Sequence, residues 1–92
     1  MGSISLTDKR IVVTGGARGL GRAFAEAAID AGARVVVADI LEDVGRQTVE
    51  VLSNSGEAHF EPVDLGDPDS ITALAENAGR RLGGVEGLVN CA

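Results

Sequence analysis

A glycine-rich stretch, TGGARGLG at residues 14–21, is the segment best suited to chemistry. It follows a short apolar run at residues 11–13 and opens a segment with helical periodicity. Glycines spaced as G-x-x-x-G-x-G let the backbone approach a ligand closely, and a helix N-terminus aims N–H groups at a phosphate. The spacing differs from G-x-G-x-x-G, and no Lys-Ser/Thr pair of a Walker A loop follows. We therefore predict a phosphate-binding turn; the alternative is a tight strand-to-helix turn without a ligand.

An acidic residue, Asp39, ends the next apolar run, 18 residues after Gly21. A carboxylate at that place accepts hydrogen bonds from the ribose diol of an adenosine. It disfavours a ribose with a 2′-phosphate, because two unit charges ~4 Å apart repel by roughly 1–4 kcal/mol between water and an effective dielectric constant of 20. The sequence thus predicts NAD in preference to NADP. Arg18 in the glycine turn would favour NADP if it met a 2′-phosphate; the alternative for Arg18 is a solvated loop charge.

Two further polar residues follow or end apolar runs. Asp64 can hydrogen-bond the amino group of an adenine, with Leu65 packed beside the ring, or it can simply form a turn. Asn90 can hold neighbouring strands together through its amide, or it can cap one strand. Thr14 is expected to brace the glycine turn through its hydroxyl.

Four apolar runs predict strands and three amphipathic segments predict helices that position these residues. We predict strands at 10–14, 34–39, 58–63 and 85–90, and helices at 20–31, 42–53 and 68–82. The second strand is a β-branched run without alternation, which favours burial on both faces of a parallel sheet. The order β-α-β-α-β-α-β predicts an α/β fold with a doubly wound parallel sheet. Ligands of such sheets bind beyond the carboxyl ends of the strands, where the glycine turn, Asp39, Asp64 and Asn90 would converge.

Apolar spacing also predicts which face each helix buries. The expected stripe of the first helix is Leu20, Ala23, Phe24, Ala27, Ala28 and Ala31, with Gly32 as its left-handed C′ cap. The stripe of the second helix is Val44, Thr48, Val51 and Leu52. The stripe of the third helix is Ile71, Leu74, Ala75, Ala78 and Leu82, after an N-cap at Asp67 and Pro68 at the first helical position.

Length and composition predict one small globular domain over residues 1–92. The net charge of −6 argues against nucleic acid or an anionic membrane as a partner. No apolar run approaches the ~18 residues of a membrane-spanning helix, and residues 1–8 lack the features of a signal peptide. The single cysteine, Cys91, excludes an intrachain disulfide and is expected to be a small buried residue. We expect a cytoplasmic protein, and no metal site around the single histidine, His59.

The chain resembles the N-terminal half of a short-chain dehydrogenase/reductase. The family's motif Thr-Gly-x-x-x-Gly-x-Gly is matched in full within residues 14–21. Asp39 is similar to the acidic residue of the NAD-preferring branch, and Asp64-Leu65 to the pair that contacts adenine. Val89-Asn90-Cys91-Ala92 is similar to the start of the family's Asn-Asn-Ala-Gly motif, with Cys91 in place of the second Asn. The resemblance therefore implies a Rossmann-like sheet and a dinucleotide-binding segment over residues 1–92.

The resemblance implies hydride transfer between a nicotinamide cofactor and an alcohol or ketone, in a homo-oligomeric parent enzyme. The cofactor-binding residues expected from it are Thr14, Gly15, Ala17, Arg18, Gly19, Leu20, Gly21, Asp39, Ile40, Asp64, Leu65, Asn90, Cys91 and Ala92. The family's catalytic Ser and Tyr-x-x-x-Lys are not expected here, since the sequence has no Tyr and its only Lys is Lys9. The 92 residues alone should thus hold at most the adenosine and pyrophosphate end of the cofactor, without catalysing the reaction. The alternative function is a non-catalytic nucleotide-binding or regulatory half-domain that another chain completes.

Overall fold

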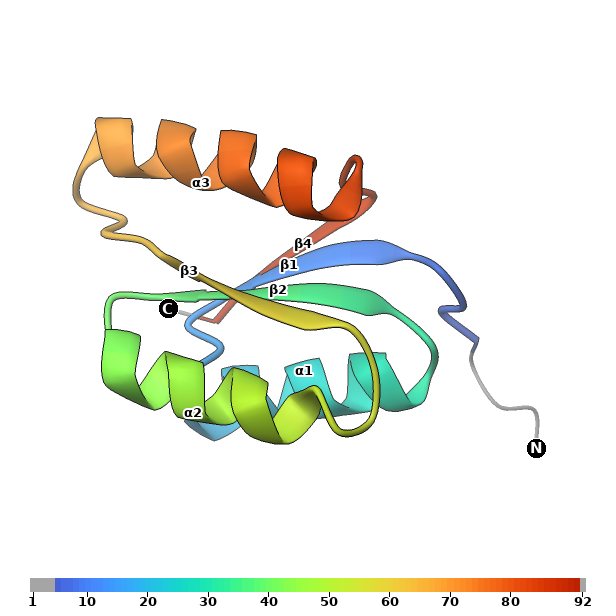
Figure 1. Ribbon diagram of the computed structural model, residues 1–92. Helices are drawn as coiled ribbons and strands as arrows, with labels where there is room; N and C mark the ends of the chain where they lie inside the picture. The colour runs from blue at the N-terminus through green and yellow to red at the C-terminus, as the bar shows by residue number, and fades with distance from the viewer. Residues whose placement is uncertain (1–4, 92) are drawn as a thin grey trace.

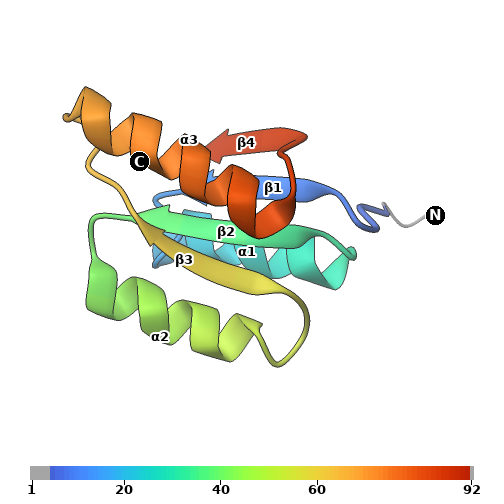
Figure 2. The same cartoon turned by 45° about the horizontal axis from the view of Figure 1, so that its top comes forward.

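The computed structural model describes residues 5–91 as a parallel four-stranded sheet between two layers of helices. The elements in chain order are β1 (Arg10–Thr14), α1 (Gly19–Asp30), β2 (Arg34–Asp39), α2 (Glu42–Leu52), β3 (Ala58–Pro62), α3 (Pro68–Leu82) and β4 (Gly87–Asn90). Helices α1 and α2 cover one face of the sheet and α3 covers the other (Figures 1 and 2). The predicted α/β, doubly wound parallel fold is confirmed.

The strand order is β3-β2-β1-β4, so the chain crosses from one half of the sheet to the other after β3. Strand β1 lies between β2 and β4, and Thr14 at its end is aligned with both Ala38 and Asn90. All pairings are parallel, and the carboxyl ends of the strands therefore share one edge of the sheet. The reversal of strand order beside β1 is the place where such sheets bind ligands.

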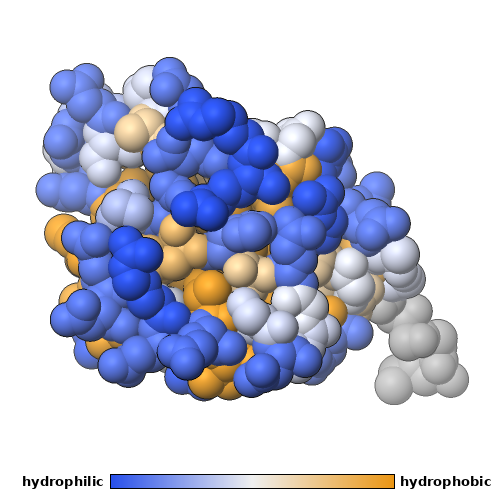
Figure 3. Space-filling view, viewed as in Figure 1, coloured by the Kyte–Doolittle hydropathy of each residue, from blue (hydrophilic) through white to orange (hydrophobic). Residues whose placement is uncertain are grey.

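The core has one part on each face of the sheet. Val13, Val35 and Val37 pack under α1 and α2 with Ile29 and Phe60. On the other face, buried residues of β1, β2 and α3 pack together, among them Val12, Val36, Leu74 and Leu82. Alternate valines of β2 thus enter opposite parts of the core, which explains its continuous β-branched run. Polar side chains cover most of the face seen in Figure 3, where apolar residues show only as separate patches.

The predicted buried face of α1 is wrong in most positions. Ala28 is buried as expected, but Leu20 is 80% exposed and Phe24 is 39% exposed. The helix buries Gly21, Ala25, Ala28 and Ile29 instead. A Cβ at Gly21 would lie 2.1 Å from the carbonyl oxygen of Gly15, so the first turn of α1 must place this glycine against the glycine turn. That close approach fixes the rotation of an alanine-rich helix whose apolar pattern permits more than one buried face.

The buried faces of α2 and α3 were predicted in part. Thr48 and Leu52 are buried on α2, whereas Val44 and Val51 are exposed. Gly45 is also buried, because it packs directly against the Phe60 ring of β3. A Cβ at Gly45 would lie 2.1 Å from that ring, so only a glycine lets this side of α2 approach β3 so closely. Helix α3 buries Leu74, Ala78 and Leu82, while Ile71 and Ala75 line an open apolar groove of ≈ 360 Å³ beside β4.

Most predicted element ends are confirmed. The Asp67 side chain accepts a hydrogen bond from the Asp69 N–H at 3.0 Å as the N-cap of α3, and Gly32 has the positive φ of 99° expected after α1. The last strand begins at Gly87 rather than at residue 85. Gly83 and Gly84, with φ of 79° and 144°, turn the chain after α3, and the next residues complete that turn before pairing begins.

Candidate functional site

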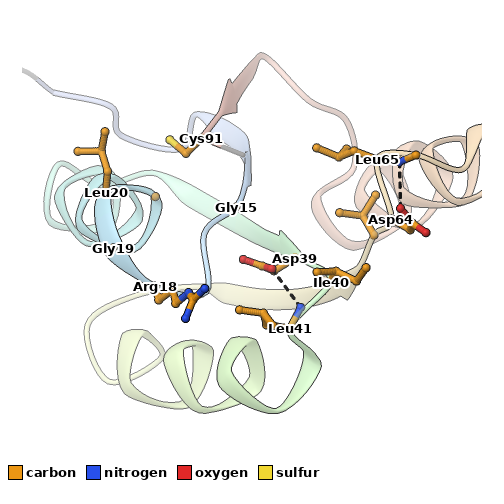
Figure 4. Close-up of a pocket in the computed structure, with 13 residues that line it drawn as sticks. Gly15, Arg18, Gly19, Leu20, Asp39, Ile40, Leu41, Asp64, Leu65 and Cys91 are labelled. Carbon is orange, nitrogen blue, oxygen red and sulfur yellow. Dashed lines mark hydrogen bonds between the residues drawn. The ribbon is translucent and has the colours of Figure 1, made fainter.

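A cavity of ≈ 580 Å³ opens at the carboxyl edge of the sheet, beside the reversal in strand order. Figure 4 shows Gly19 and Leu20 at one end of it and Asp64 and Leu65 at the other. Ten predicted residues line it: Gly15, Arg18, Gly19, Leu20, Gly21, Asp39, Ile40, Asp64, Leu65 and Cys91. Thr14, Ala17 and Asn90 lie outside its lining, and Ala92 lies outside the described residues. Three further residues, which were not predicted, also line it: Leu41 and Gly66 follow the predicted Ile40 and Leu65, and Val63 precedes Asp64.

Each glycine of the motif has a different role in the turn. Gly15 has φ of 67°, and its N–H donates to the Ala38 carbonyl at 2.8 Å, which fastens the turn to β2. Gly19 has φ of 61°, and a Cβ there would meet nothing within 4 Å, so this side of the turn is open to the cavity. Gly21 instead permits the close contact between α1 and the turn.

The N-terminus of α1 has the properties of an anion site. Arg18 is its N-cap but makes no side-chain capping bond, and the first turn contains no acidic residue. Gly19, Leu20 and Gly21 of this first turn all line the cavity. The helix dipole and free backbone N–H groups of such a turn favour a phosphate.

Asp39 is held by the backbone at the end of β2. Its side chain is nearly buried, at 9% exposure. One carboxylate oxygen accepts from the Ala17 N–H at 3.1 Å, and the other accepts from the Leu41 N–H at 3.0 Å. Each oxygen of a carboxylate has room for a second hydrogen bond. The carboxylate is therefore fixed at the cavity wall, where it can still accept from the hydroxyls of a diol.

Ala17 is buried behind this wall, and both its backbone N–H and its carbonyl are held by side chains. Besides its N–H bond to Asp39, its carbonyl accepts a hydrogen bond from the Thr48 hydroxyl of α2 at 2.6 Å. Thr48 was predicted only as part of the buried stripe of α2, without this contact. The one local indication of such a contact was the presence of a polar residue, Thr48, among apolar residues on that stripe.

The Asp64 carboxylate forms a turn, as one of its two interpretations predicted. Its Oδ1 accepts from the Gly66 N–H at 2.9 Å (Figure 4), and its own N–H donates to the Ser70 hydroxyl at 2.9 Å. Its neighbour Leu65 and the residue Ile40, which is 63% exposed, both present apolar surface at the cavity. A flat ring could pack against such apolar side chains.

Thr14 and Asn90 tie the ends of β1 and β4 together. The Thr14 hydroxyl donates to Asn90 Oδ1 at 2.8 Å, and the Cys91 N–H donates to the Thr14 carbonyl at 3.0 Å. This arrangement confirms that Asn90 holds neighbouring strands together. Cys91 is half-buried rather than buried, and it lines the cavity.

Other chemistry has little support within residues 5–91. No group of three or more His, Cys, Asp and Glu side chains in this range could hold a metal ion. His59 contacts Glu57 on the strand surface, with 2.9 Å between its Nε2 and the carboxylate. No helix in the described range is long and apolar enough to cross a membrane.

The sequence model of the family described as short chain dehydrogenase matches residues 9–92. The chain belongs to the short-chain dehydrogenase family. Among its relatives, this short-chain dehydrogenase segment is 40% identical over 80 residues to the fluoren-9-ol dehydrogenase of a Terrabacter strain. That match covers 87% of this chain and 22% of the relative. The family resemblance seen in the sequence is confirmed.

Solved structures of short-chain dehydrogenases share the fold closely. A short chain dehydrogenase from Mycobacterium smegmatis matches with a TM-score of 0.94 and 29% identity, over 99% of this chain and 39% of that protein. The complex of Pseudomonas aeruginosa RhlG with NADP matches with a TM-score of 0.91 and 32% identity, over 97% and 36% of the two chains. The chain thus spans well under half the length of these relatives.

Proposed function

We propose that this chain binds a nicotinamide dinucleotide and forms the cofactor-binding part of a short-chain oxidoreductase. The observation that carries the proposal is one cavity lined by the glycine turn, the N-terminus of α1 and the fixed carboxylate of Asp39. Its volume of ≈ 580 Å³ lies within the usual range of sites for small molecules and cofactors. Membership of the family supports the same conclusion.

The lining residues would contact the successive parts of the cofactor from one end of the cavity to the other. The pyrophosphate would lie against Gly19 and the first turn of α1, because Gly19 leaves open space and the helix end favours an anion. The hydroxyls of the adenosine ribose would donate hydrogen bonds to the Asp39 carboxylate. The adenine would pack between Ile40 and Leu65, with Asp64 beside it.

The nicotinamide half of the cofactor would extend toward the end of β4. Asn90 ends this strand, and Cys91 lines the cavity directly after it. The bond between Thr14 and Asn90 keeps this wall fixed relative to the glycine turn, since Thr14 directly precedes Gly15. We therefore assign Asn90 and Cys91 to the nicotinamide end.

NAD is the cofactor that we propose, in preference to NADP. Asp39 cannot turn away from a 2′-phosphate without losing hydrogen bonds to two backbone N–H groups, those of Ala17 and Leu41. The repulsion of roughly 1–4 kcal/mol expected at ~4 Å therefore remains. Arg18 also lines the cavity and acts in the opposite direction, and the related RhlG structure is a complex with NADP. The fixed position of Asp39 is the reason for choosing NAD.

For the whole protein we propose hydride transfer between the nicotinamide and a small alcohol or ketone. The bound cofactor supplies the hydride acceptor or donor. The residues of this chain bind the cofactor, orient it through the glycine turn and shield its adenosine end in the cavity. The chain contains no Tyr, so a tyrosine acid/base must come from outside these 92 residues.

The test is calorimetric titration of the chain with NAD and with NADP, in the native sequence and in two variants. Asp39→Ala removes the acid at the cavity. Asp43→Ala is the matched control, because it removes the same charge from an exposed position at the start of α2 outside the cavity lining. We expect saturable binding that prefers NAD, and a loss of that preference by about tenfold in Asp39→Ala only.

The preference is compared as a ratio, since Asp39→Ala also removes two acceptors of backbone hydrogen bonds and can weaken both cofactors together. An unchanged ratio in folded Asp39→Ala would exclude Asp39 as the selector. No binding of either cofactor to the folded native chain would refute the proposed function for this chain.

A further inference from the structure

Thr48 makes a long-range contact with the glycine turn from a place outside the cofactor cavity. It lies in the middle of α2 and is 1% exposed. Its hydroxyl donates to the Ala17 carbonyl at 2.6 Å, across 31 positions of the sequence. A threonine inside a helix commonly donates to the carbonyl four residues earlier, as Thr72 of α3 does to Pro68 at 3.1 Å. Thr48 donates to another element instead, and this contact joins α2 to the turn.

The contact completes the fastening of the turn to its surroundings. The N–H groups of Gly15 and Ala17 are held by the end of β2, through the Ala38 carbonyl and the Asp39 carboxylate. Below the turn there is little free space, because a Cβ at Gly16 would lie 3.0 Å from both the Val13 carbonyl oxygen and the Val37 side chain. The Thr48 hydroxyl then holds the carbonyl side of Ala17, immediately before the open segment that lines the cavity.

We infer that Thr48 is a positioning residue that holds the glycine turn in its phosphate-binding conformation. This inference rests on the proposed function, in which the segment 18–21 binds the pyrophosphate of the cofactor. Glycine-rich backbone has many accessible conformations, so an unfastened turn would have to be ordered when the phosphate binds. A turn that is already fixed avoids that cost, and its fastening contributes to affinity without touching the ligand.

Three variants separate the hydroxyl from the shape of the side chain. Thr48→Val keeps the shape and removes the hydroxyl, and Thr48→Ser keeps the hydroxyl and removes a methyl group. Thr72→Val is the matched control, since it removes a helical threonine hydroxyl whose bond stays within α3, on the other face of the sheet.

Each variant is titrated with NAD, and the affinity is corrected for the folded fraction measured by a urea melt. We expect about tenfold weaker NAD binding by Thr48→Val, with Thr48→Ser and Thr72→Val within about threefold of the native chain. A merely structural Thr48 would change the folded fraction and leave the corrected affinity unchanged. Native affinity in folded Thr48→Val would overturn the inference while leaving the proposed function intact.

Amide hydrogen exchange across residues 15–21, without cofactor, tests the inference even if the native chain does not bind NAD. We expect faster exchange in this segment for Thr48→Val than for Thr48→Ser and the native chain, under conditions where all are folded. Equal exchange in the three proteins would show that the hydroxyl does not hold the turn. Absence of NAD binding by the native chain would refute only the proposed function.

Discussion

Replacing Gly21 by alanine should destabilise the protein, although the same change inside a helix normally stabilises it. Alanine is favoured over glycine in a helix interior by roughly 1 kcal/mol. At Gly21, however, the added Cβ would lie 2.1 Å from the Gly15 carbonyl oxygen, 2.7 Å from the Gly15 carbonyl carbon and 3.0 Å from the Gly16 Cα. All three contacts are with backbone atoms, so no flexible side chain can move aside.

The size of the effect follows from the shortest contact. Ordinary van der Waals contact begins at 3.4 Å, so the helix and the turn would have to separate by more than an ångström. Overpacking costs about 1–3 kcal/mol, and a clash with backbone atoms this close belongs to the upper part of that range, about 2–3 kcal/mol, which outweighs the gain of roughly 1 kcal/mol in helix propensity. We expect a net loss of about 1–2 kcal/mol in the free energy of unfolding, or a melting temperature lower by about 4–16 °C.

Gly79→Ala provides the matched control within the same chain. Gly79 is likewise a helical glycine, in α3, but a Cβ there would meet nothing within 4 Å. This variant should gain about 0.5–1 kcal/mol. Urea unfolding followed by circular dichroism suits both variants, because the chain has no Trp or Tyr for fluorescence. Native or increased stability of Gly21→Ala would refute the close approach between α1 and the turn.

Three further predictions concern the strand ends, the response to acid and the thiol in the cavity. Thr14→Val should cost about 1 kcal/mol of unfolding free energy, because it breaks the bond to Asn90; a urea melt equal to that of the native chain would contradict this bond. The hydrogen bond from Arg10 lowers the pKa of Glu86 in the folded state, so its contribution to stability is present above the unfolded pKa and is lost as pH falls through the folded pKa. Urea melts between pH 6 and about 3 should show a smaller acid loss for Glu86→Gln than for the native chain, and parallel curves would count against the ion pair. NAD should slow the reaction of Cys91 with a soluble thiol reagent, since the half-buried thiol lines the cavity; an unchanged rate at saturating NAD would place the cofactor elsewhere.

The strands and their shared edge could be predicted because their signals are local. The β-branched run of β2 predicts burial on both faces, and Asp39 and Asn90 mark where strands end. Once the strands are parallel, their carboxyl ends must share one edge, so the convergence at the cavity followed from the order of elements alone. The glycine spacing predicted the turn for the same reason.

The rotation of α1 could not be predicted, because it depends on an approach between residues in three dimensions. Alanines lie on most sides of this helix, so the apolar spacing was also compatible with a buried stripe through Leu20 and Phe24. The clash that a side chain at Gly21 would make with Gly15 selects a different face. The bond from Thr48 to Ala17 is similarly long-range, and neither residue has a local signal for the other. For Asp64, local reasoning found the turn but could not choose it over the contact with adenine.

A titration of the ¹⁵N-labelled chain with NAD, followed by amide resonances, tests the central claim most directly. Each backbone amide gives its own resonance, so binding at the glycine turn is distinguished from binding elsewhere on the molecule. We expect saturable shifts of the amide resonances of residues 15–21 and of the residues that follow Asp39 and Asp64. The amides of Gly32 and Gly56, which precede β2 and β3 at the opposite edge of the sheet, should change little. Absence of shifts in the folded chain, or shifts confined to the groove between α3 and β4, would contradict a cofactor site at the carboxyl edge.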